Sequence, residues 1–190
     1  MSRIIAGFVG SLRLTSPAKV TRPTSDRVKE SLFSSLESMD ALVGTRVLDL
    51  FAGTAALGLE AISRGAKSLV AVEKSKAAAD ICQKNIDLVQ NALAKQDLRP
   101  EIHLINKDAK GFLKSNKSEF DLVLIDPPYE MTNDELAETC QLLIGSLAPG
   151  ALVVVERSSR EVIPELANFS LQSQKSYGDT AVYFFRVSAQ

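Results

Sequence analysis

The sequence has 190 residues, of which 45% are hydrophobic and 24% charged, and its formal net charge is −1. This composition predicts one globular domain with a sizeable core, and no apolar run approaches the length that spans a membrane. Two isolated cysteines and the single histidine, His103, argue against a disulfide framework and against a metal site. We therefore expect no metal and a cytoplasmic location.

The charge is uneven along the chain. Residues 1–30 carry six basic side chains against two acidic ones, a balance of +4, and the remainder carries −5. The basic residues of this segment are Arg3, Arg13, Lys19, Arg22, Arg27 and Lys29. A basic segment on a mildly acidic body predicts an anionic partner at one end of the molecule.

Two short strands, at residues 3–7 and 11–14, are predicted to form an N-terminal hairpin. A proline-bracketed linker follows, and hydrophobic residues at helical spacing then predict an amphipathic helix over 25–38. We expect residues 1–24 to form a hairpin and basic arm beside a main body over 25–190, within one globular unit.

From residue 46 onward, apolar strands alternate with helices. Strands are predicted at 47–51, 68–72, 102–105, 120–125 and 151–156, and helices at 57–63, 76–93, from 108 and at 133–144. Continuous apolar strands separated by helices indicate a parallel sheet with helices on both faces. Residues 169–177 and 181–187 have no helix between them and predict a C-terminal antiparallel hairpin. The expected fold class is α/β, with a mostly parallel sheet of seven strands.

Carboxylates follow the first four strands of this predicted sheet. They are Asp49, Glu73, Asp108 and Asp126. A loop of small residues, from Asp49 to Gly58, follows the first strand and leads into a helix. Ligands of an open parallel sheet bind outside the carboxyl ends of its strands, so this edge is the candidate ligand site.

Two cofactors compete for this site. Glu73 lies twenty residues after Gly53, where a dehydrogenase would have a ribose-binding acid. The loop is Gly53-x4-Gly58 rather than GxGxxG, however, and a pyrophosphate is disfavoured beside a carboxylate. A cofactor with a cationic amino-acid end tolerates acids, which favours S-adenosylmethionine. Its expected contacts are Asp49 and the backbone of Ala52 and Gly53 for the methionine moiety, Glu73 for the ribose, Asp108 and Ala109 for the adenine, and Asp126 beside both cofactor and target.

The sequence Asp126-Pro127-Pro128-Tyr129 directly follows a strand. Two prolines stiffen the turn and remove two N–H donors, so it offers carbonyl oxygens and the Asp126 carboxylate as acceptors. Tyr129 adds a ring that can lie against a flat ligand. The predicted catalytic residues are Asp126, Pro127 and Tyr129, which would hold an amino group carried on a planar ring.

The four strand-end signals together resemble the class I, Rossmann-like methyltransferases, and the Asp-Pro-Pro-Tyr sequence is similar to the form found in amino-methyltransferases. Six further segments, in order, are similar to the bacterial small-subunit ribosomal RNA guanine-N2 methyltransferases. They are residues 3–7, 22–29, 48–53, 57–61, 63–66 and 177–180. The resemblance runs from residue 3 to about 187. It implies methyl transfer from S-adenosylmethionine to a guanine N2 of 16S rRNA.

The resemblance also implies a partner. We expect 16S rRNA within a small ribosomal subunit or its assembly intermediate, bound by a monomer without membrane association. Phosphate contacts are expected from Arg3, Arg13, Arg22, Arg27 and Lys29. For Arg22, pairing with the cofactor carboxylate is an alternative role.

Two departures from the family pattern keep other functions open. Ala55 stands where family members usually have a glycine, and its methyl group is expected either to narrow the approach to the cofactor or to exclude a positive φ. Phe8 and Val9 occupy hairpin positions that tend to be basic in the family. The alternatives are N6-adenine methylation of RNA or DNA, because adenine also presents an amino group, and a cofactor-binding assembly factor with weakened catalysis.

Overall fold

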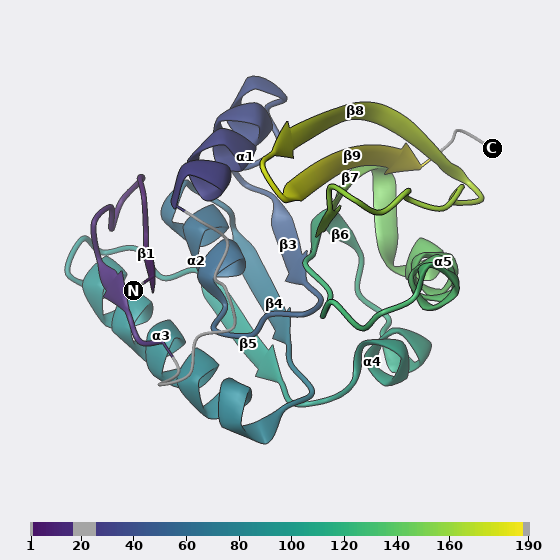
Figure 1. Ribbon diagram of the computed structural model, residues 1–190. Coiled ribbons are helices and arrows are strands. Elements are labelled where there is room, and N and C mark those ends of the chain that lie inside the picture. Colours follow the sequence, from purple (N-terminus) through teal and green to yellow (C-terminus); the bar gives the residue numbers. More distant parts are fainter. Residues whose placement is uncertain (1, 17–25, 188–190) are drawn as a thin grey trace.

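The computed structural model describes residues 2–16 and 26–187, which form a small N-terminal hairpin and a seven-stranded sheet flanked by helices (Figure 1). The sheet has the strand order β5-β4-β3-β6-β7-β9-β8. The strands from β5 to β7 pair in parallel, and β9 is antiparallel to both of its neighbours. Their bounds are β3 Arg46–Asp49, β4 Ser68–Val72, β5 Glu101–Ile105, β6 Phe120–Ile125, β7 Leu147–Ser158, β8 Phe169–Tyr177 and β9 Thr180–Val187. The predicted α/β fold with a C-terminal antiparallel hairpin is confirmed.

Helices cover both faces of the sheet (Figure 1). One face carries α1 Asp26–Ser38, α2 Ala56–Ser63 and α3 Lys76–Ala94, and the other carries α4 Ala109–Ser115 and α5 Asn133–Leu143, with a 3-10 turn at Ile144–Ser146. Successive strand residues alternate between two hydrophobic clusters: Leu122 and Leu124 of β6 join the first, and Val123 and Ile125 join the second. This two-sided burial explains why the strands are continuous apolar runs in the sequence. No helix within residues 2–16 and 26–187 has the length and apolarity to cross a membrane.

Strand β7 begins at Leu147, four residues before the predicted start. Its pairing with β6 is irregular, because Phe120 pairs with Leu147 but Leu122 pairs with Leu152. Gly150 has a φ of 74°, which lets the chain bulge at this point and then resume the strand. The Pro149-Gly150 sequence therefore lies inside β7 rather than in front of it.

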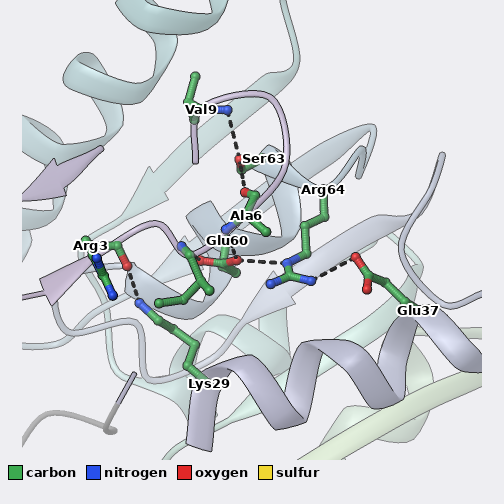
Figure 2. A network of polar contacts seen from close by, with 9 residues as sticks. Arg3, Ala6, Val9, Lys29, Glu37, Glu60, Ser63 and Arg64 are labelled. Atoms are coloured by element: carbon green, nitrogen blue, oxygen red, sulfur yellow. Dashed lines mark hydrogen bonds and ion pairs between the residues drawn. The ribbon is translucent and has the colours of Figure 1, made fainter. Parts of the chain in front are cut away.

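The N-terminal strands β1 Ser2–Arg3 and β2 Arg13–Leu14 are shorter than predicted. The N–H groups of Ile5 and Ala6 do not continue the ladder but donate to the carboxylate of Glu60, at 2.6 and 3.1 Å. Figure 2 shows Ala6 beside Glu60. A long-range acceptor thus replaces the partner strand, which local sequence pattern could not reveal.

Glu60 is fully buried on α2, and its charge is balanced locally. Arg64, one helical turn later, donates to Glu60 at 2.8 Å and to Glu37 of α1 at 2.8 Å (Figure 2). Ser63 accepts the N–H of Val9 at 3.1 Å. A buried carboxylate is costly unless partners satisfy it, and the hairpin supplies two of them. The hairpin is therefore docked against α2.

Candidate active site

The site lies at the point where the order of the parallel strands reverses: β4 and β5 lie on one side of β3, and β6 and β7 lie on the other. Strand β3 pairs with both β4 and β6, so its end is the switch point of this parallel sheet. Asp49 is the last residue of β3, opposite Ala71 on one side and Leu124 on the other. Glu73 and Asp126 each lie two residues beyond these partners, so the structure brings the three predicted carboxylates together on adjacent strands.

The loop after β3 is fixed by two of these carboxylates. Asp49 accepts the N–H of Gly58 at 3.0 Å in the first turn of α2, and Glu73 accepts the N–H of Gly53 at 2.8 Å. A Cβ at Gly58 would lie 2.6 Å from the side chain of the buried Leu69, which would have to move to accommodate it. At Gly53 a Cβ would have nothing within 4 Å, so the backbone is open to a ligand.

Asp49 has an unusual environment for a carboxyl group. Its side chain is 1% exposed, and burial raises its pKa to about 7, with smaller upward contributions from Asp126 and Glu73 and an opposing one from the Gly58 N–H. A cation placed beside it would stabilise its charged form. The site is thus suited to a positively charged ligand.

Glu73 and Asp108 are also held by backbone donors. The second oxygen of Glu73 accepts the N–H of Ser75 at 2.7 Å, and Asp108 caps α4 by accepting the N–H of Gly111 at 2.8 Å. Each carboxylate oxygen has two lone pairs, so both groups can accept a further hydrogen bond. Sequence reasoning missed Asn106, which donates to the carbonyl oxygen of Glu73 at 2.7 Å and braces the end of β4.

The Asp126–Tyr129 turn connects β6 to α5. Asp126 is half-buried, Pro127 is buried, and Tyr129 is 68% exposed, with its ring available at the surface. The N–H of Met131 donates to the Pro128 carbonyl at 3.0 Å and closes the turn. The predicted amino-group contact depends on the carbonyl of Pro127, one residue earlier in this turn. Ala109 is the first residue of α4, which follows β5, and it is buried in the second hydrophobic cluster.

Ala55 adopts the left-handed conformation, with φ 59° and ψ 24°. The expectation that its methyl group excludes a positive φ is therefore wrong. The residue is fully buried and belongs to the first hydrophobic cluster, so its methyl group packs into the core and does not narrow the open side of the loop.

Asn85 of α3 is a site residue that the sequence did not reveal. It is fully buried, and its amide donates to the carbonyl of Thr54 at 3.0 Å and to that of Thr15 at 3.1 Å. Its oxygen accepts the N–H of Thr15 at 2.8 Å. One side chain therefore joins the N-terminal hairpin to the loop after β3. A buried asparagine on an amphipathic helix was the available signal, but its partners are far away in sequence.

The predicted phosphate contacts differ in their surroundings. Arg13 and Arg27 are exposed, and Arg3 is exposed but pairs with Asp26 at 2.9 Å. Lys29 is a correction, because it is 1% exposed and its ammonium donates to the Arg3 carbonyl (Figure 2). Burial also lowers its pKa, and no phosphate reaches it in this arrangement. Arg22 lies outside the described residues.

Metal and thiol chemistry gain no support from the described part of the chain. It contains no group of three or more histidine, cysteine, aspartate or glutamate residues that could hold a metal ion. Cys82 and Cys140 are buried free thiols, and burial raises the pKa of each to about 12. Both therefore stay protonated near neutral pH.

Comparisons with known proteins match this chain over nearly its full length. The sequence profile of the family described as Conserved hypothetical protein 95 matches residues 2–186. The Ribosomal RNA small subunit methyltransferase D of Escherichia coli K12 is 34% identical over 192 residues, covering 99% of this chain and 91% of the relative. The protein of the same name from Haemophilus influenzae is 34% identical over 179 residues, covering 93% and 89%.

A solved structure has the same architecture. The putative methyltransferase yhhF from Escherichia coli superposes with a TM-score of 0.81 at 35% sequence identity, covering 99% of this chain and 98% of that one. The likeness includes the N-terminal hairpin, because the alignment leaves almost none of either chain out.

Proposed function

The chain belongs to the family of the ribosomal RNA small subunit methyltransferase D proteins, and from this premise we propose that it transfers a methyl group from S-adenosylmethionine to the exocyclic N2 of a guanine in 16S rRNA. The observation that carries the proposal is the placement of the Asp126-Pro127 acceptors next to the carboxylates of Asp49 and Glu73. The same edge thus offers a place for a cationic cofactor and one for an amino group.

The residues at the edge fit this cofactor. When bound, S-adenosylmethionine supplies an electrophilic methyl group on a sulfonium. Asp49 supplies a buried carboxylate that a nearby cation would stabilise, and Gly53 leaves open backbone beside it. Glu73 and Asp108 are held by backbone N–H groups and keep lone pairs for ribose hydroxyls and an adenine amino group.

The turn after β6 would position the target base. The lone pair of a guanine N2 is delocalised into the ring, so the nitrogen is a poor nucleophile. Asp126 and the Pro127 carbonyl would each accept one N–H, orienting the nitrogen and stabilising the positive charge that develops on it. The exposed ring of Tyr129 would stack on the base, which must be unpaired or flipped out. Stacking of this kind is worth about 1–3 kcal/mol per base.

Exposed cations would bind the RNA backbone. Arg3, Arg13 and Arg27 are the described candidates, and Arg22 keeps both of its proposed roles. Phosphate contacts of this kind fix the position of the RNA and leave base identity to the pocket. The substrate we propose is 16S rRNA in a small ribosomal subunit or its assembly intermediate, modified in the cytoplasm by a monomer.

The test offers the protein undermodified small ribosomal subunits, free ribosomal RNA and DNA, each with labelled S-adenosylmethionine, followed by mass mapping of the labelled nucleotide. We expect a label on guanine N2 in RNA. A label on adenine N6 would show that the target base is adenine and not guanine. Cofactor binding measured by calorimetry, without any methyl transfer, would indicate the assembly-factor alternative.

Substitution of Asp126 tests the catalytic turn. Asp126→Ala should still bind cofactor, measured by calorimetry, and lose about 100-fold or more in the rate of methyl transfer at saturating cofactor, because one acceptor of the developing charge is gone. Asp134→Ala removes an exposed acid a few residues further on and should leave the rate unchanged. Near-normal transfer by Asp126→Ala would refute the assignment.

A further inference from the structure

The turn between β8 and β9 lies at the same edge of the sheet as the candidate active site. Strand β7 runs parallel to β6, with Val155 opposite Ile125, so both strands end at this edge. Strand β9 is antiparallel to β7, with Thr180 opposite Ser158, so it begins there. Thr180 therefore lies two strands across from Asp126 and two residues further along the strand direction, so the β8–β9 turn, residues 177–180, is roughly 12–15 Å away at the usual strand spacing and rise.

This turn holds the segment that follows β7. The N–H of Ser159 donates to the Asp179 carbonyl at 2.9 Å, and the Ser159 hydroxyl donates to the Gly178 carbonyl at 2.8 Å. The guanidinium of Arg160 donates to the Asp179 carboxylate at 3.1 Å. Three contacts thus fix the direction in which the chain presents Arg160, whose side chain is 81% exposed.

The same turn also holds α1, which lies beside it in Figure 1. The hydroxyls of Tyr177 and Ser31 are hydrogen-bonded, and Lys175 donates to Ser35 of α1 at 2.6 Å. Arg27 precedes Ser31 by four residues and so shares its helix face one turn nearer the start of α1. The turn therefore contacts Arg160 directly through Asp179 and contacts α1 at Ser31, one helical turn from the exposed Arg27.

The charge of the edge gives these arginines a role. The ends of the strands and the loops that follow them carry Asp49, Glu73, Asp108 and Asp126, so an RNA backbone that delivers a base here meets carboxylates. Cations next to the turn would offset this repulsion, and a guanidinium can bind a phosphate through two parallel hydrogen bonds. Arg160 pairs with Asp179 at the surface, where an ion pair contributes little to stability, so exchanging the carboxylate for a phosphate costs little.

We propose that Arg160, presented by the β8–β9 turn, binds a phosphate of the RNA strand near the target nucleotide. This inference rests on the proposed function, because it takes RNA as the ligand of this edge. It assigns a purpose to residues 177–180, which the methyl-transfer chemistry leaves without one.

The experiment measures binding of an unmethylated transcript of small-subunit ribosomal RNA between about 50 and 200 mM salt, where phosphate contacts dominate the salt dependence. Arg160→Ala should lower the slope of log affinity against log salt by roughly 0.7–0.9, the loss of one phosphate contact. Arg160→Lys keeps the charge and should keep the slope. The matched control is Arg99→Ala. Arg99 is an exposed arginine just before β5, so it lies at the amino ends of the parallel strands, away from the candidate site at their carboxyl ends.

Each outcome decides the matter. A lower slope for Arg160→Ala alone supports the inference, and a slope equal to those of the wild type and Arg99→Ala overturns it. An equal loss of slope in Arg160→Lys would also overturn it, because the salt slope depends on the charge, whereas losing the paired hydrogen bonds of the guanidinium weakens binding without changing the slope. Methyl transfer to the same transcript is measured separately. Transfer with an unchanged slope refutes only the Arg160 contact, and a changed slope without transfer refutes only the proposed reaction.

Discussion

Replacing Asp49 with asparagine should stabilise the cofactor-free protein at alkaline pH and destabilise it slightly at acid pH. The pKa of this carboxyl is raised from 3.8 to about 7, chiefly by burial. Because the folded pKa lies above the unfolded one, the native state holds a proton that the unfolded chain has released between about pH 4 and 7. The stability that this bound proton contributes is fully present below about pH 4 and is lost as the pH rises through 7.

The magnitude follows from the size of the shift. A shift of about 3 pKa units corresponds to an upper value of about 4 kcal/mol, the cost of a buried carboxylate above pH 7. Asparagine carries no charge, and its oxygen can still accept the N–H of Gly58. Its buried NH2 group adds an unsatisfied donor that costs about 1–3 kcal/mol. The expected net gain at pH 8 is therefore about 1–3 kcal/mol, or roughly 3–10 °C in melting temperature for a chain of this length.

Thermal unfolding of the wild type and Asp49→Asn at pH 5, 6, 7 and 8 measures this effect. The variant should melt higher at pH 8 and at or below the wild type at pH 5. Asp87→Asn, which removes an exposed carboxyl from α3, should show no such change of sign. Added S-adenosylmethionine should raise the melting temperature of the wild type but not of Asp49→Asn, because the charge facing the cofactor is gone. If the melting temperatures of the two proteins differ by the same amount at pH 5 and at pH 8, the inference that burial raises the pKa of Asp49 is refuted.

Two further substitutions examine the loop after β3. Asn85→Ala leaves the carbonyl of Thr54 and both backbone groups of Thr15 without their partner, so the dissociation constant of the cofactor should rise about 10- to 100-fold, as calorimetry would measure. Asn116→Ala removes a side-chain amide on the far side of the sheet, and it should cost stability without weakening the cofactor; equal cofactor affinity in the two variants would contradict the positioning role. Ala55→Gly relieves a left-handed alanine, a gain of about 1–2 kcal/mol. It also loses about 0.8 kcal/mol of methyl burial and adds conformational freedom to the unfolded chain, which together offset most of that gain. Its melting temperature and cofactor affinity should stay close to those of the wild type, and a tenfold gain in affinity would show that the methyl group obstructs the site.

The sequence predicted the sheet because its strands are buried on both faces. An apolar run such as Phe120–Ile125 admits few other interpretations once helices flank it, and a parallel sheet brings the ends of its strands to one edge. The meeting of Asp49, Glu73 and Asp126 followed from that rule alone. Their proposed roles are a different matter, because ligand contacts depend on chemistry that strand order does not specify.

The features that sequence reasoning missed depend on contacts distant in the chain. The ladder of the N-terminal hairpin stops early because Glu60 takes two of its N–H groups, 54 and 55 positions away. Lys29 was predicted to contact phosphate because it is a basic residue in a basic segment. In the fold, its ammonium points toward the Arg3 carbonyl and away from solvent. A charge count along residues 1–30 cannot separate an exposed cation from a buried one.

The same long-range contacts bear on Ala55, the residue that motivated the weakened-catalysis alternative. Gly53 and Ala55 both have a positive φ, and an alanine in this conformation costs about 1–2 kcal/mol. Side chains from three elements hold the loop around them: Glu73 binds the Gly53 N–H, Asn85 binds the Thr54 carbonyl, and Asp49 binds the turn of α2 that follows. A hydrogen bond between neutral groups contributes about 0.5–1.5 kcal/mol and one to a charged group about 1.5–3 kcal/mol, so the three contacts together offset the strain of one alanine. The loop keeps its shape without a second glycine, and Ala55 therefore gives no reason to prefer a protein that has lost catalysis.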